Sequence, residues 1–269
     1  QGYSSAASDV YKRQLQHGSM YTIVNSNLLF HASIPLNADR TMKEVEIRGH
    51  KYAGKELLQQ TELLMRAPFT RDVAPEYLDF ARDYYWYLWC GPDSALFDKS
   101  KMATFERYFL TDKGVRHEEK GFYYTLREDA EVCDMLLDAF GVQGEHRHII
   151  NGHVPVKAGK GERPVKANGK MMVIDGGFAK AYHDTTGIAG YTLVYHSRGF
   201  QLVQHEPFTS EEDAVTTGSD IVSTVEIVEL NSARVCVRDT DIGRVLQGQI
   251  DELRMLLAAY RKGLLQEKL

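Results

Sequence analysis

The segment His148–Tyr195 reads HIINGHVPVKAGKGERPVKANGKMMVIDGGFAKAYHDTTGIAGYTLVY, and the fold of the chain is interpreted outward from it. A short apolar run, Ile149-Ile150, leads into the loop Asn151-Gly152-His153. A histidine that follows a strand and a glycine is well placed to bind a metal ion, because glycine lets the backbone turn tightly beside the ion. A second apolar run ends in the acidic, glycine-rich turn Asp175-Gly176-Gly177. The segment therefore predicts a site built at strand ends.

The stretch between these two runs is basic and contains no aromatic residue. Its cations are Lys157, Lys160, Arg163, Lys166 and Lys170. Cationic side chains close to a metal ligand are typical of a site for phosphate esters, so we expect this group to include the ligands of a phosphate. An ordinary solvated loop explains any single member equally well, and the sequence does not choose among them.

Strand patterns also flank this segment. Tyr21–Val24 and Leu28–Phe30 are short apolar or β-branched runs separated by turn residues, and the second run ends at His31. His31 is therefore a second histidine directly after a predicted strand. A loop histidine without a function remains the alternative for either His31 or His153 taken alone.

The remaining patterns predict a mixed α/β (α+β) chain. Residues 42–145 are mostly helical in pattern, and 219–237 fits either one helix or two strands. The segment Asp241–Glu267 predicts a long amphipathic helix. Its apolar face comprises Ile250, Leu253, Leu256, Leu257 and Tyr260. Three further strands are predicted at Lys170–Asp175, Ile188–Tyr195 and Gly199–Glu206.

Composition narrows the class of protein. The 269 residues are 43% hydrophobic and 26% charged, as in an ordinary globular protein, and the net charge of -5 argues against a general nucleic-acid binder. Three widely separated cysteines indicate a reducing cytoplasm, and no apolar run approaches the roughly 18 residues that a membrane span needs. Residues 1–14 are small and polar without periodicity, so we expect a foreign or disordered leader there.

Six strings carry a resemblance to a known family: NLLFHASIPL (27–36), WCGPDSALF (89–97), KMATFERYF (101–109), IINGHVPVK (149–157), VIDGGFAKAY (173–182) and TGIAGYTLVY (186–195). Together they resemble the class 3 fructose-1,6-bisphosphatases over residues 15–269. The resemblance implies part of a calcineurin-like metallophosphoesterase β-sandwich, with a helical insertion at 42–145 and a C-terminal helix. It also implies hydrolysis of the 1-phosphate of fructose 1,6-bisphosphate in gluconeogenesis, in the cytoplasm.

Enzymes of this superfamily hold two divalent ions, here expected to be Mn²⁺, which activate a water for attack on phosphorus. The resemblance places His31 and His153 at the two late histidine ligands. Ala32 and Ser33 stand where the family commonly has a glycine and a cysteine. The earlier motifs GDxHG, GDxxDRG and GNH[DE] occur nowhere in the 269 residues, so no catalytic residue is assignable and the metal site is incomplete.

These absences predict that the chain is a C-terminal fragment and is inactive when isolated. The resemblance implies a sugar bisphosphate as the small-molecule partner, no nucleic acid, no membrane, and a homo-oligomer. Two alternatives stay open: a metallophosphatase of another substrate class, and a non-catalytic oligomerisation or binding module.

Overall fold

The computed structural model describes residues 2–177, 179–188, 190–205, 210–217 and 223–265. Its helices are α1 (Gly2–His17), α2 (Gly54–Arg66), α3 (Pro75–Cys90), α4 (Thr104–Phe109), α5 (Tyr123–Leu126), α6 (Ala130–Phe140), α7 (Lys180–Thr186), α8 (Glu211–Thr217) and α9 (Asp241–Arg261). Its strands are β1 (Tyr21–Val24), β2 (Asn27–Phe30), β3 (Val45–Ile47), β4 (His50–Tyr52), β5 (His148–Asn151), β6 (Val165–Lys166), β7 (Met171–Val173), β8 (Gly190–His196), β9 (Gly199–His205) and β10 (Ser223–Leu230). Single 3-10 turns lie at Ala67–Phe69, Ala158–Lys160, Ala167–Gly169 and Val237–Asp239.

The central sheet has the strand order β1-β2-β5-β7-β6. Its three inner strands, β2, β5 and β7, are parallel, with Leu28 opposite Ile149 and Ile149 opposite Met171. Both faces of a parallel sheet are normally covered, so its strands are apolar throughout. The burial agrees, because every residue of β5 and of β7 is buried.

A second sheet, with the antiparallel order β10-β9-β8, packs on one face of the central sheet. Residues alternate between the two faces, as strand geometry requires. Ile150 and Met172 pack with Phe200 of the second sheet, whereas Ile149 belongs to the core shared with α6. The mixed α/β class is therefore confirmed, with two stacked sheets and a C-terminal helix.

The segment predicted as a helical insertion, 42–145, has a mixed content. It contains the hairpin β3–β4 besides α2 to α6. Helices α2 and α3 enclose a small core of their own around Leu57 and Tyr84, whereas α6 buries Leu136 and Leu137 in the main core. Residues 219–237, which fitted one helix or two strands, contain the single strand β10 among the described residues.

The N-terminal segment differs from the expectation of an unstructured leader, because α1 runs through it from Gly2 to His17. The physical reason lies in tertiary contacts that the sequence does not show. Arg66 on α2 donates hydrogen bonds to the carbonyl oxygens of Leu15 and Gly18. Ser19 donates to Glu62 over 2.7 Å. These contacts fix the end of a helix whose own pattern is weak.

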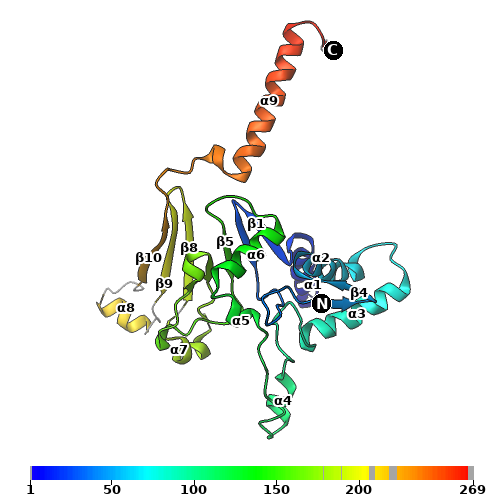
Figure 1. Cartoon of the computed structure of the whole chain (residues 1–269), viewed down its shortest axis with the longest axis vertical. Helices are drawn as coiled ribbons and strands as arrows, with labels where there is room; N and C mark the ends of the chain where they lie inside the picture. The colour runs from blue at the N-terminus through cyan, green and yellow to red at the C-terminus, as the bar shows by residue number, and fades with distance from the viewer. Residues whose placement is uncertain (1, 178, 189, 206–209, 218–222, 266–269) are drawn as a thin grey trace.

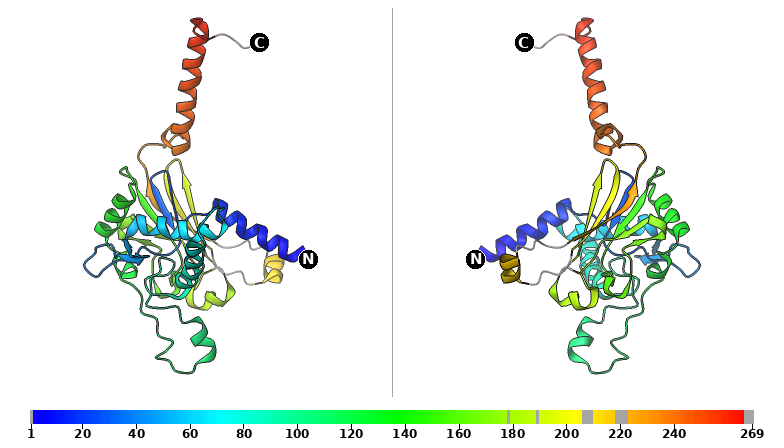
Figure 2. Two further views of the ribbon diagram at one scale, coloured as in Figure 1. Left: turned by 90° about the vertical axis from the view of Figure 1, so that its right-hand side faces the viewer. Right: turned by 90° about the vertical axis from the view of Figure 1, so that its left-hand side faces the viewer.

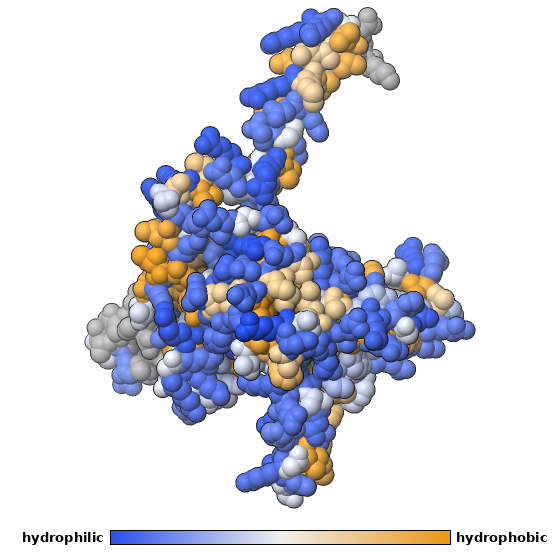
Figure 3. Space-filling model, in the orientation of Figure 1, coloured by the Kyte–Doolittle hydropathy of each residue, from blue (hydrophilic) through white to orange (hydrophobic). Residues whose placement is uncertain are grey.

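Helix α9 stands away from the rest of the molecule in every view (Figures 1 and 2). The amphipathic pattern predicted for 241–267 is confirmed as a helix over Asp241–Arg261. Its apolar side chains are exposed and form orange patches in Figure 3. Among the described residues, no helix combines the length and apolar character that crossing a membrane requires.

Candidate metal centre

The candidate site lies at the carboxyl edge of the parallel strands. His31 follows β2 directly, His153 comes two residues after β5, and Asp175 comes two residues after β7. Because these strands are parallel neighbours, their carboxyl ends meet at one edge of the sheet. Ligands of open α/β sheets commonly bind at this edge. The structure therefore brings the two predicted histidines together.

The two imidazoles face each other directly. Nε2 of His31 lies 3.1 Å from Nδ1 of His153, and the ring centroids are 5.1 Å apart. His31 is exposed and His153 is half-buried. Imidazole nitrogens bind transition metals at about 2.0–2.1 Å, so two ring nitrogens at this separation can both be ligands of one ion. The donor chemistry and the spacing fit a divalent transition metal.

The loop backbone fixes this arrangement. The N–H of Gly152 donates to the carbonyl oxygen of His31 over 2.8 Å, which joins the two histidine loops. The tight turn expected from Gly152 falls instead on His153, whose φ is +66°. A left-handed conformation is uncommon for a residue other than glycine, and such conformations cluster at functional sites.

The surroundings favour the neutral form of His153. Burial lowers its pKa, and the charges of His31 and Lys99 act in the same direction, while Asp175 opposes them. A neutral imidazole offers the lone pair that a metal ion needs. The environment of His153 thus favours the form of the imidazole that can bind a metal ion.

Buried hydrogen bonds of Asn151 stabilise the carboxyl edge of the sheet beneath the two histidines. The side-chain amide of Asn151 donates to the carbonyl oxygen of Ala32 over 2.9 Å and to the hydroxyl of Tyr123 over 2.6 Å. Tyr123 is fully buried, and burial raises its pKa well above the ordinary value. No pattern in the sequence indicates the role of Tyr123, because α5 is too short for a periodic pattern.

A third ligand is not assembled. Asp175 lies close to the loop, since a Cβ built on Gly152 would be 3.9 Å from its Oδ2. Its Oδ1 accepts a hydrogen bond from the N–H of Gly177 over 2.9 Å. Across the part of the chain that the structure describes, no three His, Cys, Asp or Glu side chains are grouped to hold a metal ion. The chain contributes two histidines to the site.

The five predicted phosphate ligands have different surroundings. Arg163 pairs with Glu226 at 2.6 Å, and the buried Lys166 pairs with Glu128 at 2.5 Å. Lys170 pairs with Asp134 at 2.8 Å.

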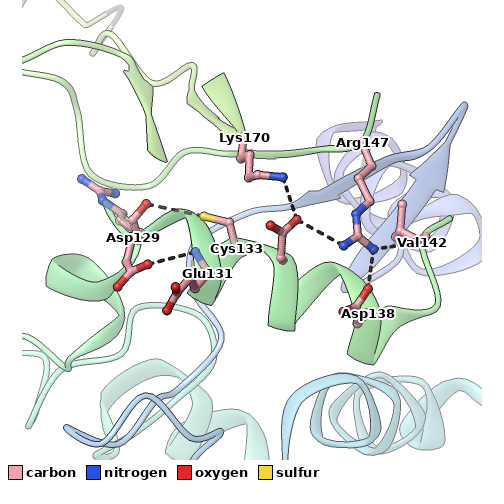
Figure 4. Close-up of polar contacts among 9 residues, drawn as sticks. Asp129, Glu131, Cys133, Asp138, Val142, Arg147 and Lys170 are labelled. Carbon is pink, nitrogen blue, oxygen red and sulfur yellow. Dashed lines mark hydrogen bonds and ion pairs between the residues drawn. The ribbon is translucent and has the colours of Figure 1, made fainter. Parts of the chain in front are cut away.

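Figure 4 shows Lys170 converging with Arg147 on α6, on the helix-covered face of the sheet. Lys157 and Lys160 are exposed. Ion pairs therefore engage three of the five cations, and Lys157, four residues after His153, remains the best-placed member of the group.

The fold and the histidine pair define a mixed α/β protein with a candidate metal site at the carboxyl edge of its parallel strands. A family model described as Firmicute fructose-1,6-bisphosphatase matches residues 7–262, and the chain belongs to this family. The match begins inside the segment that the sequence suggested to be foreign.

Curated relatives agree with this assignment. The chain is 64% identical over 253 residues to a fructose-1,6-bisphosphatase class 3 from Phocaeicola vulgatus, covering 94% of the chain and 38% of the relative. It is 58% identical over 270 residues to the protein of the same description from Parabacteroides distasonis, covering 99% of the chain and 40% of the relative. It is 54% identical over 250 residues to the protein of this description from Listeria monocytogenes, covering 93% of the chain and 38% of the relative. The chain thus spans about two fifths of the length of these relatives. No solved structure matches the chain.

Proposed function

We propose that this chain provides two histidine ligands of the metal site of a fructose-1,6-bisphosphate 1-phosphatase. The observation that carries the proposal is the 3.1 Å approach of His31 and His153 in a chain of this family. The names of the relatives support the substrate, fructose 1,6-bisphosphate. The proposed role is in gluconeogenesis, with the cytoplasm as the proposed location.

The proposed cofactor is a divalent cation, with Mn²⁺ as the candidate ion. A bound divalent ion supplies an activated water and neutralises charge on phosphoryl oxygens. His31 and His153 would hold it through neutral ring nitrogens. Asn151 and Tyr123 keep the loop after β5 fixed against the loop after β2. Two histidines are too few for a dinuclear site, so we propose that the chain alone does not turn over substrate.

A chimera tests the proposed activity. This chain replaces the aligned segment of the Phocaeicola vulgatus relative, and phosphate release from fructose 1,6-bisphosphate is measured with Mn²⁺. The proposal expects Mn²⁺-dependent release that is lost in the His153→Ala chimera and retained in the His50→Ala chimera, since His50 lies on the separate β3–β4 hairpin. A folded chimera that hydrolyses another phosphate ester but not this one would support the alternative metallophosphatase.

We also propose that the protein is a homo-oligomer that pairs through α9. Leu246, Ile250, Leu253, Leu257 and Tyr260 are exposed and spaced alternately by four and three residues. This spacing is the seam of a coiled coil, in which identical helices bury matching stripes.

A further inference from the structure

A second cluster of cations comprises four residues from separate segments. Lys99 and Lys120 are joined by a bridge, Lys120 and Arg127 share the ring of Tyr124, and Lys157 belongs to the loop after His153. Lys99 and Lys120 are directly opposite each other in an antiparallel bridge. Residues opposed in this way have Cβ atoms about 4.5–5.5 Å apart, and like charges in such pairs are destabilising. Lys99 is compensated by Glu118 at 2.9 Å. Lys120 has no carboxylate within ion-pair distance among the residues that the structure describes.

Arg127 adds a buried charge with unused donors. Its side chain is 5% exposed and approaches Glu162 only at 3.6 Å. Its Nε and Nη1 atoms are buried and have no hydrogen-bond partner within the described ranges. Donors left unpaired in this way cost free energy until a partner supplies acceptors. A guanidinium group matches phosphate oxygens in charge and shape.

The aromatic ring of Tyr124 joins the two cations. Nζ of Lys120 lies 5.3 Å from the ring centroid, and Cζ of Arg127 lies 5.4 Å from the same centroid. Since both charges approach one ring, the two distances limit their separation to about 11 Å, and the two cations belong to one cluster.

The loop after His153 completes the cluster. The backbone N–H of Lys157 donates to Oε2 of Glu162 over 3.1 Å, and Oε1 of the same carboxylate faces Arg127. The backbone of Lys157 and the side chain of Arg127 therefore share one carboxylate, that of Glu162. The charges of Lys157, Arg127 and Lys99, together with burial as the largest cause, lower the pKa of Lys120. Lys157 follows His153 by four residues, so the cluster adjoins the loop that carries this histidine.

We propose that Lys120, Arg127 and Lys157 form a binding site for a phosphate group. If the proposed function holds, this group is the phosphate of the sugar bisphosphate that is not hydrolysed at the histidine pair. The proposal keeps Lys157 from the group expected from the sequence. It replaces Arg163, Lys166 and Lys170, which are held in ion pairs elsewhere, and leaves out Lys160, which is exposed at the end of the 3-10 turn Ala158–Lys160.

Binding of inorganic phosphate to the metal-free chain tests the site by titration calorimetry in the presence of a chelator. Lys120→Gln and Lys157→Gln should each weaken binding about tenfold, the usual effect of losing one charge-assisted hydrogen bond. Lys160→Gln is the matched control, since Lys160 is an exposed lysine of the same loop, and it should leave the affinity unchanged. Arg127→Lys serves as a third variant, with its fold checked by circular dichroism.

Two results would overturn the site: no phosphate binding by the parent chain, or an equal loss in the Lys160→Gln control, which would show unspecific attraction. This assay uses no metal ion and measures binding without catalysis, so its result does not depend on the proposed activity. Phosphate binding that depends on Lys120 together with an inactive chimera would support the site and contradict the proposed function. An active chimera together with no Lys120-dependent phosphate binding would contradict the phosphate site and leave the proposed function standing.

Discussion

Nε2 of His31 lies 3.1 Å from Nδ1 of His153, although 122 residues separate them in the chain. The parallel pairing of β2 with β5 produces this approach, because each strand delivers its histidine to the same edge of the sheet. The site therefore depends on tertiary structure, and changes that loosen the strand ends should affect it as much as changes to the histidines.

The hydroxyl of Tyr123 anchors this edge from below. Tyr123→Phe removes the acceptor of the 2.6 Å hydrogen bond from Asn151 and leaves a buried amide less satisfied. We expect the free energy of unfolding to fall by about 1–3 kcal/mol, as measured by urea denaturation. Tyr108→Phe, at a residue that is 81% exposed, is the control and should change it by less than about 0.5 kcal/mol. Equal effects of the two substitutions would contradict the anchoring role.

Gly176 lies where two backbones approach closely. A Cβ at this position would lie 2.4 Å from Cα of Gly190, so Gly176→Ala forces the turn after β7 away from the start of β8. We expect a loss of about 1–3 kcal/mol in the free energy of unfolding.

Gly248→Ala provides the matched control for Gly176. Gly248 lies within α9 with no atom within 4 Å of an added Cβ, and alanine there should stabilise the helix by up to about 1 kcal/mol. A tolerated Gly176→Ala in the same denaturation assay would show that the two backbones can separate at little cost.

Asp98 predicts a specific pH dependence. Burial, followed by the charge of Asp93, raises its pKa from 3.8 to about 6, while Lys43 opposes the shift. The folded chain then binds a proton more tightly than the unfolded chain. The stability from this group is therefore complete below pH 4 and is lost as the pH rises to about 6 and beyond. The difference amounts to about 3 kcal/mol at most.

Asp98→Asn keeps a neutral side chain at every pH. Its stability relative to the parent chain should therefore increase by about 1–3 kcal/mol between pH 4.5 and pH 7.5, measured by denaturation at both values. A difference that is the same at the two pH values would contradict the raised pKa.

Pairing through α9 depends on one face of the helix. Leu253→Arg places a charge in the proposed seam and should convert the dimer to a monomer in light scattering coupled to size exclusion. Met255 is 66% exposed but lies on the opposite face, so Met255→Arg should leave the dimer intact. If the parent chain is a monomer, or if both substitutions act alike, another surface or another occupant covers the helix.

The sequence was sufficient for the individual elements that carry the site. Apolar runs ending in His31 and His153 predicted ligands after strands, and the periodicity of residues 241–267 predicted α9. The strand order that brings the histidines together depends on pairing between distant segments, which the local pattern does not encode. The helix α1 was missed for the same reason, since its end is fixed by Arg66.

The phosphate ligands show why charge alone is a weak guide. Arg163, Lys166 and Lys170 follow the proposed metal ligand His153 in sequence, but the carboxylates that engage them come from distant elements. Lys120 and Arg127 lie in segments with no periodic pattern, and only the folded chain brings them next to the loop after His153.

Titration of the chain with Mn²⁺, followed by electron paramagnetic resonance, tests the central claim most directly. We expect weak binding that falls about tenfold or more in both His31→Ala and His153→Ala and is unchanged in His50→Ala. Addition of excess chelator should remove Mn²⁺ from the protein and give the signal of the metal–chelator complex measured without protein. Mn²⁺ binding that is unaffected by loss of either histidine would contradict the assignment of His31 and His153 as metal ligands.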